Sequence, residues 1–105
     1  MVEYSLQLDS IFASLSDPTR RDILARVARG EVCIGDLVKK YDMSFAAISK
    51  HLMLMERAKL IVKRKEGRKQ MVSLAPSALM SADEYLEQYR QMWQSRYEKL
   101  DALIK

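Results

Sequence analysis

The chain has 105 residues, of which 49% are hydrophobic and 30% charged, with only three glycines and two prolines. This composition fits one compact, helix-rich domain over residues 1–105 and excludes a disordered or collagen-like chain. A single cysteine excludes an internal disulfide framework, and no apolar run approaches the roughly 20 residues that span a bilayer. We therefore expect a soluble, cytoplasmic protein without an export signal.

The net charge of +4 is concentrated in about one third of the chain. Residues 44–75 contain eight basic and two acidic side chains, whereas residues 1–43 and residues 76–105 each carry a net charge of −1. A basic segment in a nearly neutral body is typical of a phosphate-binding surface. A solvated lysine-rich face without a partner is the alternative that charge alone leaves open.

The first third of the chain has the apolar spacing of short helices. Residues 5–15 predict one helix, with apolar positions at Leu8, Ile11, Phe12 and Leu15. Asp17-Pro18 is an N-cap followed by proline at the first helical position, so it predicts a second helix. We expect this helix to stop at Gly30 in the left-handed conformation.

Residues 34–57 predict a helix-turn-helix. A short helix runs to about Tyr41, and a tight turn leads to Ser44, which caps the next helix. The buried face of that capped helix is predicted to consist of Phe45, Ile48, Leu52 and Met55.

Residues 60–74 change to the alternation of two strands and predict a β-hairpin around Gly67. Pairing about this glycine is expected to bring Val62 near Val72. The hairpin forms a basic wing, whose tip carries Lys65, Arg68 and Lys69.

A last helix is predicted over residues 78–104, with a continuous apolar stripe. At about 1.5 Å per residue it is about 40 Å long, which is more than a domain of this size can cover. We expect the stripe and the helix over 5–15 to form a two-fold interface with a second copy of the chain. The predicted dimer-interface residues are Leu8, Ile11, Phe12, Leu86, Tyr89, Trp93, Tyr97 and Leu100. The alternative is that the aromatic residues line a pocket for an aromatic or lipid-like ligand.

The order of these elements resembles the ArsR/SmtB family of winged-helix bacterial repressors. The resemblance rests on four short sequence motifs that occur in the same order as in the family. They are LSDPTRR at 15–21, SKHL at 49–52, EGRK at 66–69 and YRQMW at 89–93. The resemblance covers residues 5–104. It implies a mainly α fold with a β-hairpin wing, in the order α-α-α-α-β-β-α. It also implies a homodimer that binds a palindromic operator and represses transcription.

Residues on the capped helix and the wing are predicted to bind DNA. Small side chains at the start of that helix can approach base edges in the major groove, where Ala46 and Ala47 can touch thymine methyl groups. Wing cations can reach the phosphate backbone or the minor groove. His51, the only histidine, is expected to bind a phosphate or to form a hydrogen bond between helices. The predicted DNA-binding residues are Ser44, Ala46, Ala47, Ser49, Lys50, His51, Arg64, Arg68 and Lys69.

The sequence departs from the metal-sensing members of that family. Their short third helix carries a Cys-x-Cys pair, whereas Cys33 is followed here by Gly35 at the second position. Other members use Asp and His on the last helix, but no histidine follows Asp83. One thiolate supplies too few soft ligands for a thiophilic metal, so we expect no metal site and no cofactor. We expect no enzyme, because no nucleophile–base pair is evident.

The sequence therefore predicts a homodimeric, sequence-specific transcriptional regulator whose partners are double-stranded DNA and a second copy of itself. Two alternatives stay open. One is a winged-helix module whose basic hairpin binds an acidic protein. The other is a regulator switched by a small organic ligand at the aromatic interface.

Overall fold

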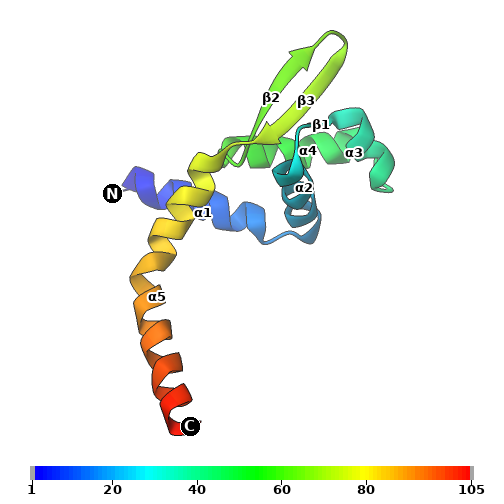
Figure 1. The fold of residues 1–105 in the computed structure, drawn as a ribbon. Coiled ribbons are helices and arrows are strands. Elements are labelled where there is room, and N and C mark those ends of the chain that lie inside the picture. The colour runs from blue at the N-terminus through cyan, green and yellow to red at the C-terminus, as the bar shows by residue number, and fades with distance from the viewer. Residues whose placement is uncertain (1, 105) are drawn as a thin grey trace.

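The structure, a computed structural model, describes residues 2–104, with side chains from residue 7 onwards. Met1 and Lys105, the two ends of the predicted domain, lie outside the described residues. Five helices and a small antiparallel sheet form a winged helix-turn-helix (Figure 1). The elements are α1 (Val2–Leu15), α2 (Pro18–Arg29), β1 (Val32–Cys33), α3 (Ile34–Lys40), α4 (Phe45–Arg57), β2 (Ile61–Glu66), β3 (Lys69–Leu74) and α5 (Pro76–Ile104).

The start of α2 confirms the predicted cap, whereas its end differs from the prediction. The Asp17 carboxylate accepts a hydrogen bond from the backbone N–H of Arg20 at 3.0 Å, and Pro18 is the first helical residue. Gly30 has φ 159° and ψ 165°, so the predicted left-handed stop is wrong. The chain leaves α2 in an extended conformation because β1 begins only two residues later.

The sheet has the strand order β1-β3-β2, and β1 is an element that the predicted order lacks. Its two residues pair with β3, where Val32 lies opposite Val72. In the hairpin, Val62 pairs with Ser73 and Lys63 pairs with Val72. Val72 is therefore adjacent to the partner of Val62, as expected, but the two side chains lie on opposite faces of the hairpin, with Val72 buried and Val62 exposed. The turn consists of Gly67 and Arg68, so the centre of the hairpin lies between these two residues and not at Gly67.

The hydrophobic core lies between the first four helices and the inner end of the sheet. The core positions predicted on α4 are buried, except Phe45, which is 60% exposed. Phe45 is the first residue of α4, and the packed part of that helix begins one turn later. The largest fully buried side chains are Ile11, Ile23, Leu37, Ile48, Leu52, Met55, Leu60, Ile61 and Val72.

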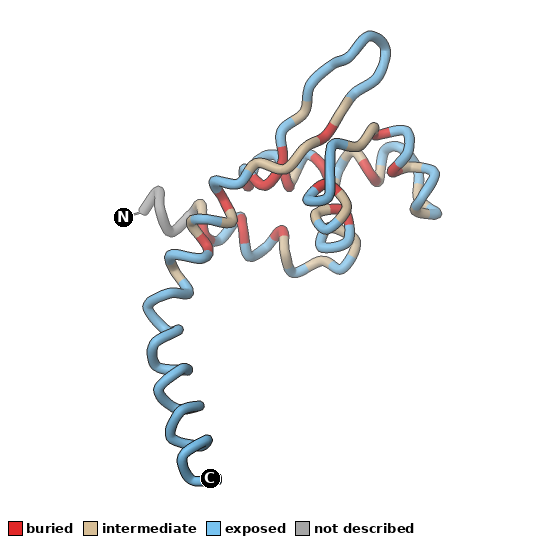
Figure 2. The backbone as a smooth tube through the Cα atoms, viewed as in Figure 1, coloured by how far each residue is buried: buried red, intermediate tan, exposed pale blue. Residues whose placement is uncertain are grey.

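Helix α5 leaves the body of the protein and runs away from it (Figures 1 and 2). Only Ala78 and Ala82 are buried, and every residue from Leu86 to Ile104 is exposed. The extents of the molecule, 59 × 35 × 21 Å, reflect this projecting helix. The apolar stripe predicted on α5 is thus left uncovered by the subunit itself.

Candidate nucleic-acid interface

Helices α3 and α4 form the predicted helix-turn-helix, and Ser44 caps α4 as expected. The Ser44 hydroxyl accepts a hydrogen bond from the backbone N–H of Ala47 at 3.1 Å. Ile48, Leu52 and Met55 fix one face of α4 in the core. On the rest of its surface, Ser44, Ala46 and Lys50 are exposed, whereas Ala47 and Ser49 are half-buried.

A polar cluster attaches the end of α3 to α2. The Tyr41 hydroxyl donates a hydrogen bond to the Asp22 carboxylate, and Arg26 Nε lies 3.0 Å from the same hydroxyl and 3.1 Å from Asp22 Oδ2. The hydrogen bond from Tyr41, followed by that from Arg26, lowers the pKa of Asp22. This cluster fixes the helix that precedes the turn into α4.

His51 forms the hydrogen bond between helices that the sequence analysis gave as one of two expectations. Its Nδ1 lies 3.2 Å from Nη1 of Arg20 on α2, and its side chain is half-buried. The other expectation, that His51 contacts a phosphate, stays a prediction.

The wing is formed by β2 and β3, and most of its cations point away from the core. Gly67 has φ 63°, the left-handed conformation that this tight turn requires. Lys65, Arg68 and Lys69 are exposed around the turn. They form a cationic tip on a narrow two-stranded projection.

Arg64, which was predicted to contact DNA, is bound to two carboxylates instead of facing solvent alone. It donates hydrogen bonds to Glu31 at 2.8 and 2.5 Å and to Glu66 at 2.9 Å. The hydrogen bonds that Arg64 donates to Glu31 lower the pKa of the Glu31 carboxyl group. The same bonds raise the pKa of the Arg64 guanidinium. Lys63 is paired as well, with Glu56 at 3.3 Å. Within residues 2–104, the other six cations of the basic segment form no ion pair.

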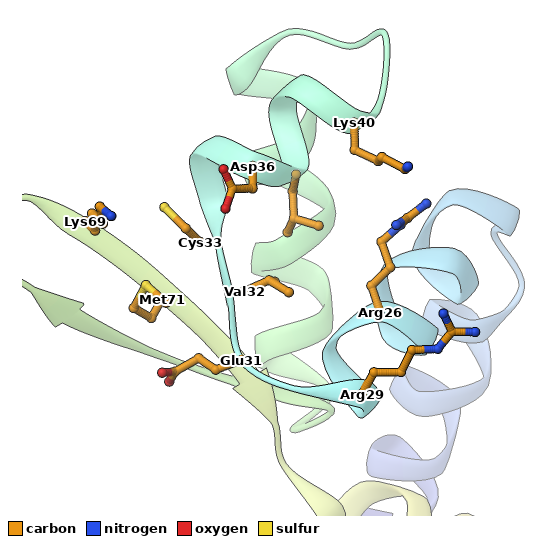
Figure 3. Close-up of a pocket in the computed structure, with 10 residues that line it drawn as sticks. Arg26, Arg29, Glu31, Val32, Cys33, Asp36, Lys40, Lys69 and Met71 are labelled. Carbon is orange, nitrogen blue, oxygen red and sulfur yellow. The ribbon is translucent and has the colours of Figure 1, made fainter.

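A hollow of about 440 Å³ lies at the base of the wing, between α2, α3 and the sheet (Figure 3). Cys33 and Met71 lie on one side of β1, and the ends of Arg26, Arg29 and Lys40 lie on the other. Within the described residues, no group of three or more His, Cys, Asp or Glu side chains could hold a metal ion.

The residues predicted for a dimer interface separate into two groups. Leu8 and Ile11 are buried inside the subunit, so they hold α1 in place and offer no surface to a partner. Phe12, by contrast, is exposed, and its ring lies 5.9 Å from that of Tyr85, edge to face. The other exposed members are Leu86, Tyr89, Trp93, Tyr97 and Leu100.

Arg20, which makes hydrogen bonds to both α1 and α4, was not predicted from the sequence. Its position in the first turn of α2 gives no signal, because arginine at such a position is ordinarily exposed. The partner on α4 is 31 residues away in the chain, which no local spacing can reveal.

The fold and this cationic surface define a winged helix-turn-helix protein of the DNA-binding class. The family model of the bacterial regulatory proteins of the arsR family matches residues 17–63. The chain is 31% identical to the HTH-type transcriptional regulator Rv2034 of Mycobacterium tuberculosis, over 77% of this chain and 76% of that protein. It is also 31% identical to the transcriptional repressor SdpR of Bacillus subtilis, over 71% of this chain and 83% of that protein.

Among solved structures, an ArsR family transcriptional regulator, RHA00566, superposes with a TM-score of 0.79 at 31% identity. The similarity covers 87% of this chain and 94% of that one. The chain belongs to the arsR family, whose members are transcriptional regulators and not enzymes. Within residues 2–104, no helix combines the length and the apolar character that crossing a membrane requires.

Proposed function

We propose that this protein is a repressor that binds a palindromic operator as a homodimer, with α4 as its recognition helix. The observation that carries the proposal is the charge distribution. Five of the eight cations of residues 44–75 lie on the exposed side of α4 or at the tip of the wing, whereas the rest of the chain is slightly acidic. DNA, with its regular array of phosphates, is the polyanion that such a surface fits.

Base reading is assigned to α4 and phosphate binding mainly to the wing. Ser49 and Lys50 have the polar groups that can read base edges, and Ala46 and Ala47 are small enough to approach thymine methyl groups. Arg68 and Lys69 are the proposed phosphate contacts, together with the free N–H groups behind Ser44. Arg64 stays in the proposed interface, where a DNA phosphate would compete with Glu31 for its guanidinium.

The dimer is proposed to form through the exposed stripe of α5, with Phe12 of α1 at its edge. Large apolar side chains on a projecting helix lose unfavourable contact with water when a second copy covers them. A two-fold axis at this helix would place two copies of α4 in successive major grooves, about 34 Å apart. The operator would then be palindromic, because its symmetry follows that of the dimer. We place this activity in the bacterial cytoplasm, where the operator DNA lies.

We propose a regulator without metal sensing, because its single thiol and single histidine supply too few soft ligands. The second candidate, a small organic effector at the aromatic interface, is favoured by a hollow of about 240 Å³ between α1 and α5. That hollow is lined by Leu8, Asp9, Phe12 and Tyr85. A thermal-shift screen of aromatic compounds, compared with the same screen on Phe12→Ala, tests this candidate.

The main experiment selects duplexes from a random pool with the wild-type protein and measures their binding by fluorescence anisotropy at several salt concentrations. Arg68→Ala is expected to weaken binding to all sequences alike and to reduce the salt slope by about one for each subunit of the dimer. Lys50→Ala or Ser49→Ala is expected to cost about 1–3 kcal/mol on the selected sequence and much less on random DNA.

Lys99→Ala, which removes an exposed cation far from the wing, serves as the matched control for Arg68→Ala. If no duplex is enriched and binding does not saturate, the protein is not a DNA-binding regulator. Saturable binding of an acidic protein in the absence of DNA binding would then favour the interaction module.

A further inference from the structure

Arg20, in the first turn of α2, connects three helices through one guanidinium. Its Nε donates a hydrogen bond to the carbonyl of Ser14 at 2.8 Å, and its Nη2 donates one to the carbonyl of Ala13 at 3.1 Å. Both carbonyls lie in the last turn of α1, where backbone oxygens have no partner within the helix. The third contact, from Nη1, reaches His51 on α4 at 3.2 Å. Arg20 thus completes the end of α1 and holds α4 against it.

The contact with Arg20 also determines the tautomer of His51. A guanidinium has donors only, so Nδ1 of His51 must accept, and in the neutral ring the proton is on Nε2. Asp17 Oδ2 lies 3.9 Å from the same Nδ1, which is too long for a hydrogen bond. The ring therefore has its Nε2–H group left as a donor for a partner outside this pair.

His51 lines a hollow of about 260 Å³ beside α4. Two of the other lining residues, Arg20 and Lys50, are cations, and the remaining two, Ala47 and Leu54, are apolar. None of these five side chains has a carboxylate. A single phosphate group has only acceptors and a negative charge, so it matches the donors and cations of this lining.

The end of α1 is itself attached to α5. Phe12 directly precedes Ala13, the residue whose carbonyl Arg20 binds, and its ring packs edge to face on Tyr85. Tyr85 packs in the same way on Tyr89, at 5.7 Å between ring centroids. The hollow beside α4 is therefore held in a fixed relation to the helix proposed to form the dimer.

We propose that Arg20 is a positioning residue that presents the Nε2–H of His51 to one phosphate of the DNA backbone. This inference rests on the proposed function. It assigns a phosphate site outside the wing, in which His51 makes the contact and Arg20 fixes the tautomer and the place of the ring.

The experiment uses a duplex enriched by the wild-type protein and a series of its copies, each with one phosphate replaced by a neutral methylphosphonate. Arg20→Lys keeps the positive charge but removes the guanidinium group, whose three nitrogens bind the carbonyls of Ala13 and Ser14 and Nδ1 of His51. His51→Asn keeps an acceptor near the position of Nδ1 and has no group at the position of Nε2. Arg21→Lys is the matched control, because Arg21 also binds the end of α1, through the carbonyl of Leu15, and forms no hydrogen bond with the described residues of α4.

Arg20→Lys and His51→Asn are each expected to lose about tenfold in affinity per subunit, the effect of one charge-assisted hydrogen bond. The double variant is expected to bind no more weakly than either single variant. One methylphosphonate position is expected to weaken the wild type and Arg21→Lys but not His51→Asn. Thermal unfolding checks that each variant is folded, and His51→Asn leaves both bonds from Arg20 to α1 in place.

Losses that multiply in the double variant would overturn the proposal, because they would show that Arg20 and His51 act separately. A methylphosphonate profile of His51→Asn identical to that of the wild type would overturn it as well. Failure of the wild type to bind any duplex would instead contradict the proposed function itself, so the two failures are distinguishable.

Discussion

The guanidinium of Arg64 on the wing donates two hydrogen bonds to the carboxylate of Glu31, 33 residues earlier in the chain. Glu31 directly precedes β1, so this fork fixes the hairpin to the edge of the body. The same fork neutralises a cation that was predicted to face DNA. Glu31 is thus both a support for the direction of the wing and a competitor of a DNA phosphate.

Glu31→Gln is expected to increase the affinity for DNA of any sequence by severalfold, because it removes one of the two carboxylates that pair with Arg64 and leaves only Glu66 to compete with a phosphate. Anisotropy titrations at several salt concentrations measure the effect, and the salt slope is expected to become steeper by up to one for each subunit of the dimer. Glu84→Gln on α5 makes the same change in net charge far from the wing. Equal gains for the two variants would show that only net charge matters.

The ion pair between Arg64 and Glu31 predicts that the stability of the fold depends on pH. Arg64 lowers the pKa of Glu31 below its ordinary value of 4.5. A carboxylate whose pKa is lower in the folded state stabilises the fold above about 4.5 and loses this effect as the pH falls through the folded pKa. Urea unfolding is therefore expected to separate the wild type from Glu31→Gln at neutral pH and to bring them together in acid.

A buried hydroxyl on α1 gives a prediction about stability. Ser14 Oγ is buried and has no hydrogen-bond partner within the described residues. Ser14→Ala is expected to raise the free energy of unfolding by about 1 kcal/mol, because it removes an unsatisfied polar group and improves helix propensity. Urea denaturation measures the change. Ser10→Ala, at an exposed position of the same helix, gives the propensity contribution alone.

Features determined by neighbouring residues could be predicted from the sequence. Asp17 and Ser44 begin their helices because a capping side chain acts over only three residues. The apolar period placed Ile48 and Leu52 in the core for a similar reason. The wing was predicted because the period changes and a glycine marks its turn.

Features determined by distant residues could not be predicted. A strand of two residues such as β1 has no period of its own and exists only because β3 pairs with it. Lys59 adopts φ 61° after α4, and no glycine marks this position. Leu60, with its N–H bonded to the carbonyl of Met55, is fully buried and holds the chain there.

Phe45 is exposed at the start of the proposed recognition helix, which predicts different effects on stability and on DNA binding. Phe45→Ala is expected to change the free energy of unfolding by less than about 0.5 kcal/mol, as at other surface positions. Ile48→Ala, at a fully buried position one turn later, is expected to cost about 2–5 kcal/mol. Selection from a random pool is expected to show an altered base preference for Phe45→Ala. An unchanged preference would exclude Phe45 from the interface.

Trp93, the only tryptophan, lies half exposed on the α5 stripe and reports directly on the proposed dimer. Its fluorescence emission is expected to shift to longer wavelength on dilution, as separation of the two copies returns the indole to water. Trp93→Ala is expected to shift sedimentation from dimer to monomer with little change in the unfolding of the subunit, because the core does not contain this side chain. Gln91→Ala, exposed on another face of α5, is expected to sediment like the wild type. If the emission does not depend on concentration and the protein sediments as a single subunit, the α5 interface is contradicted. The proposed spacing of the two recognition helices would then fail as well, because it was inferred from that interface.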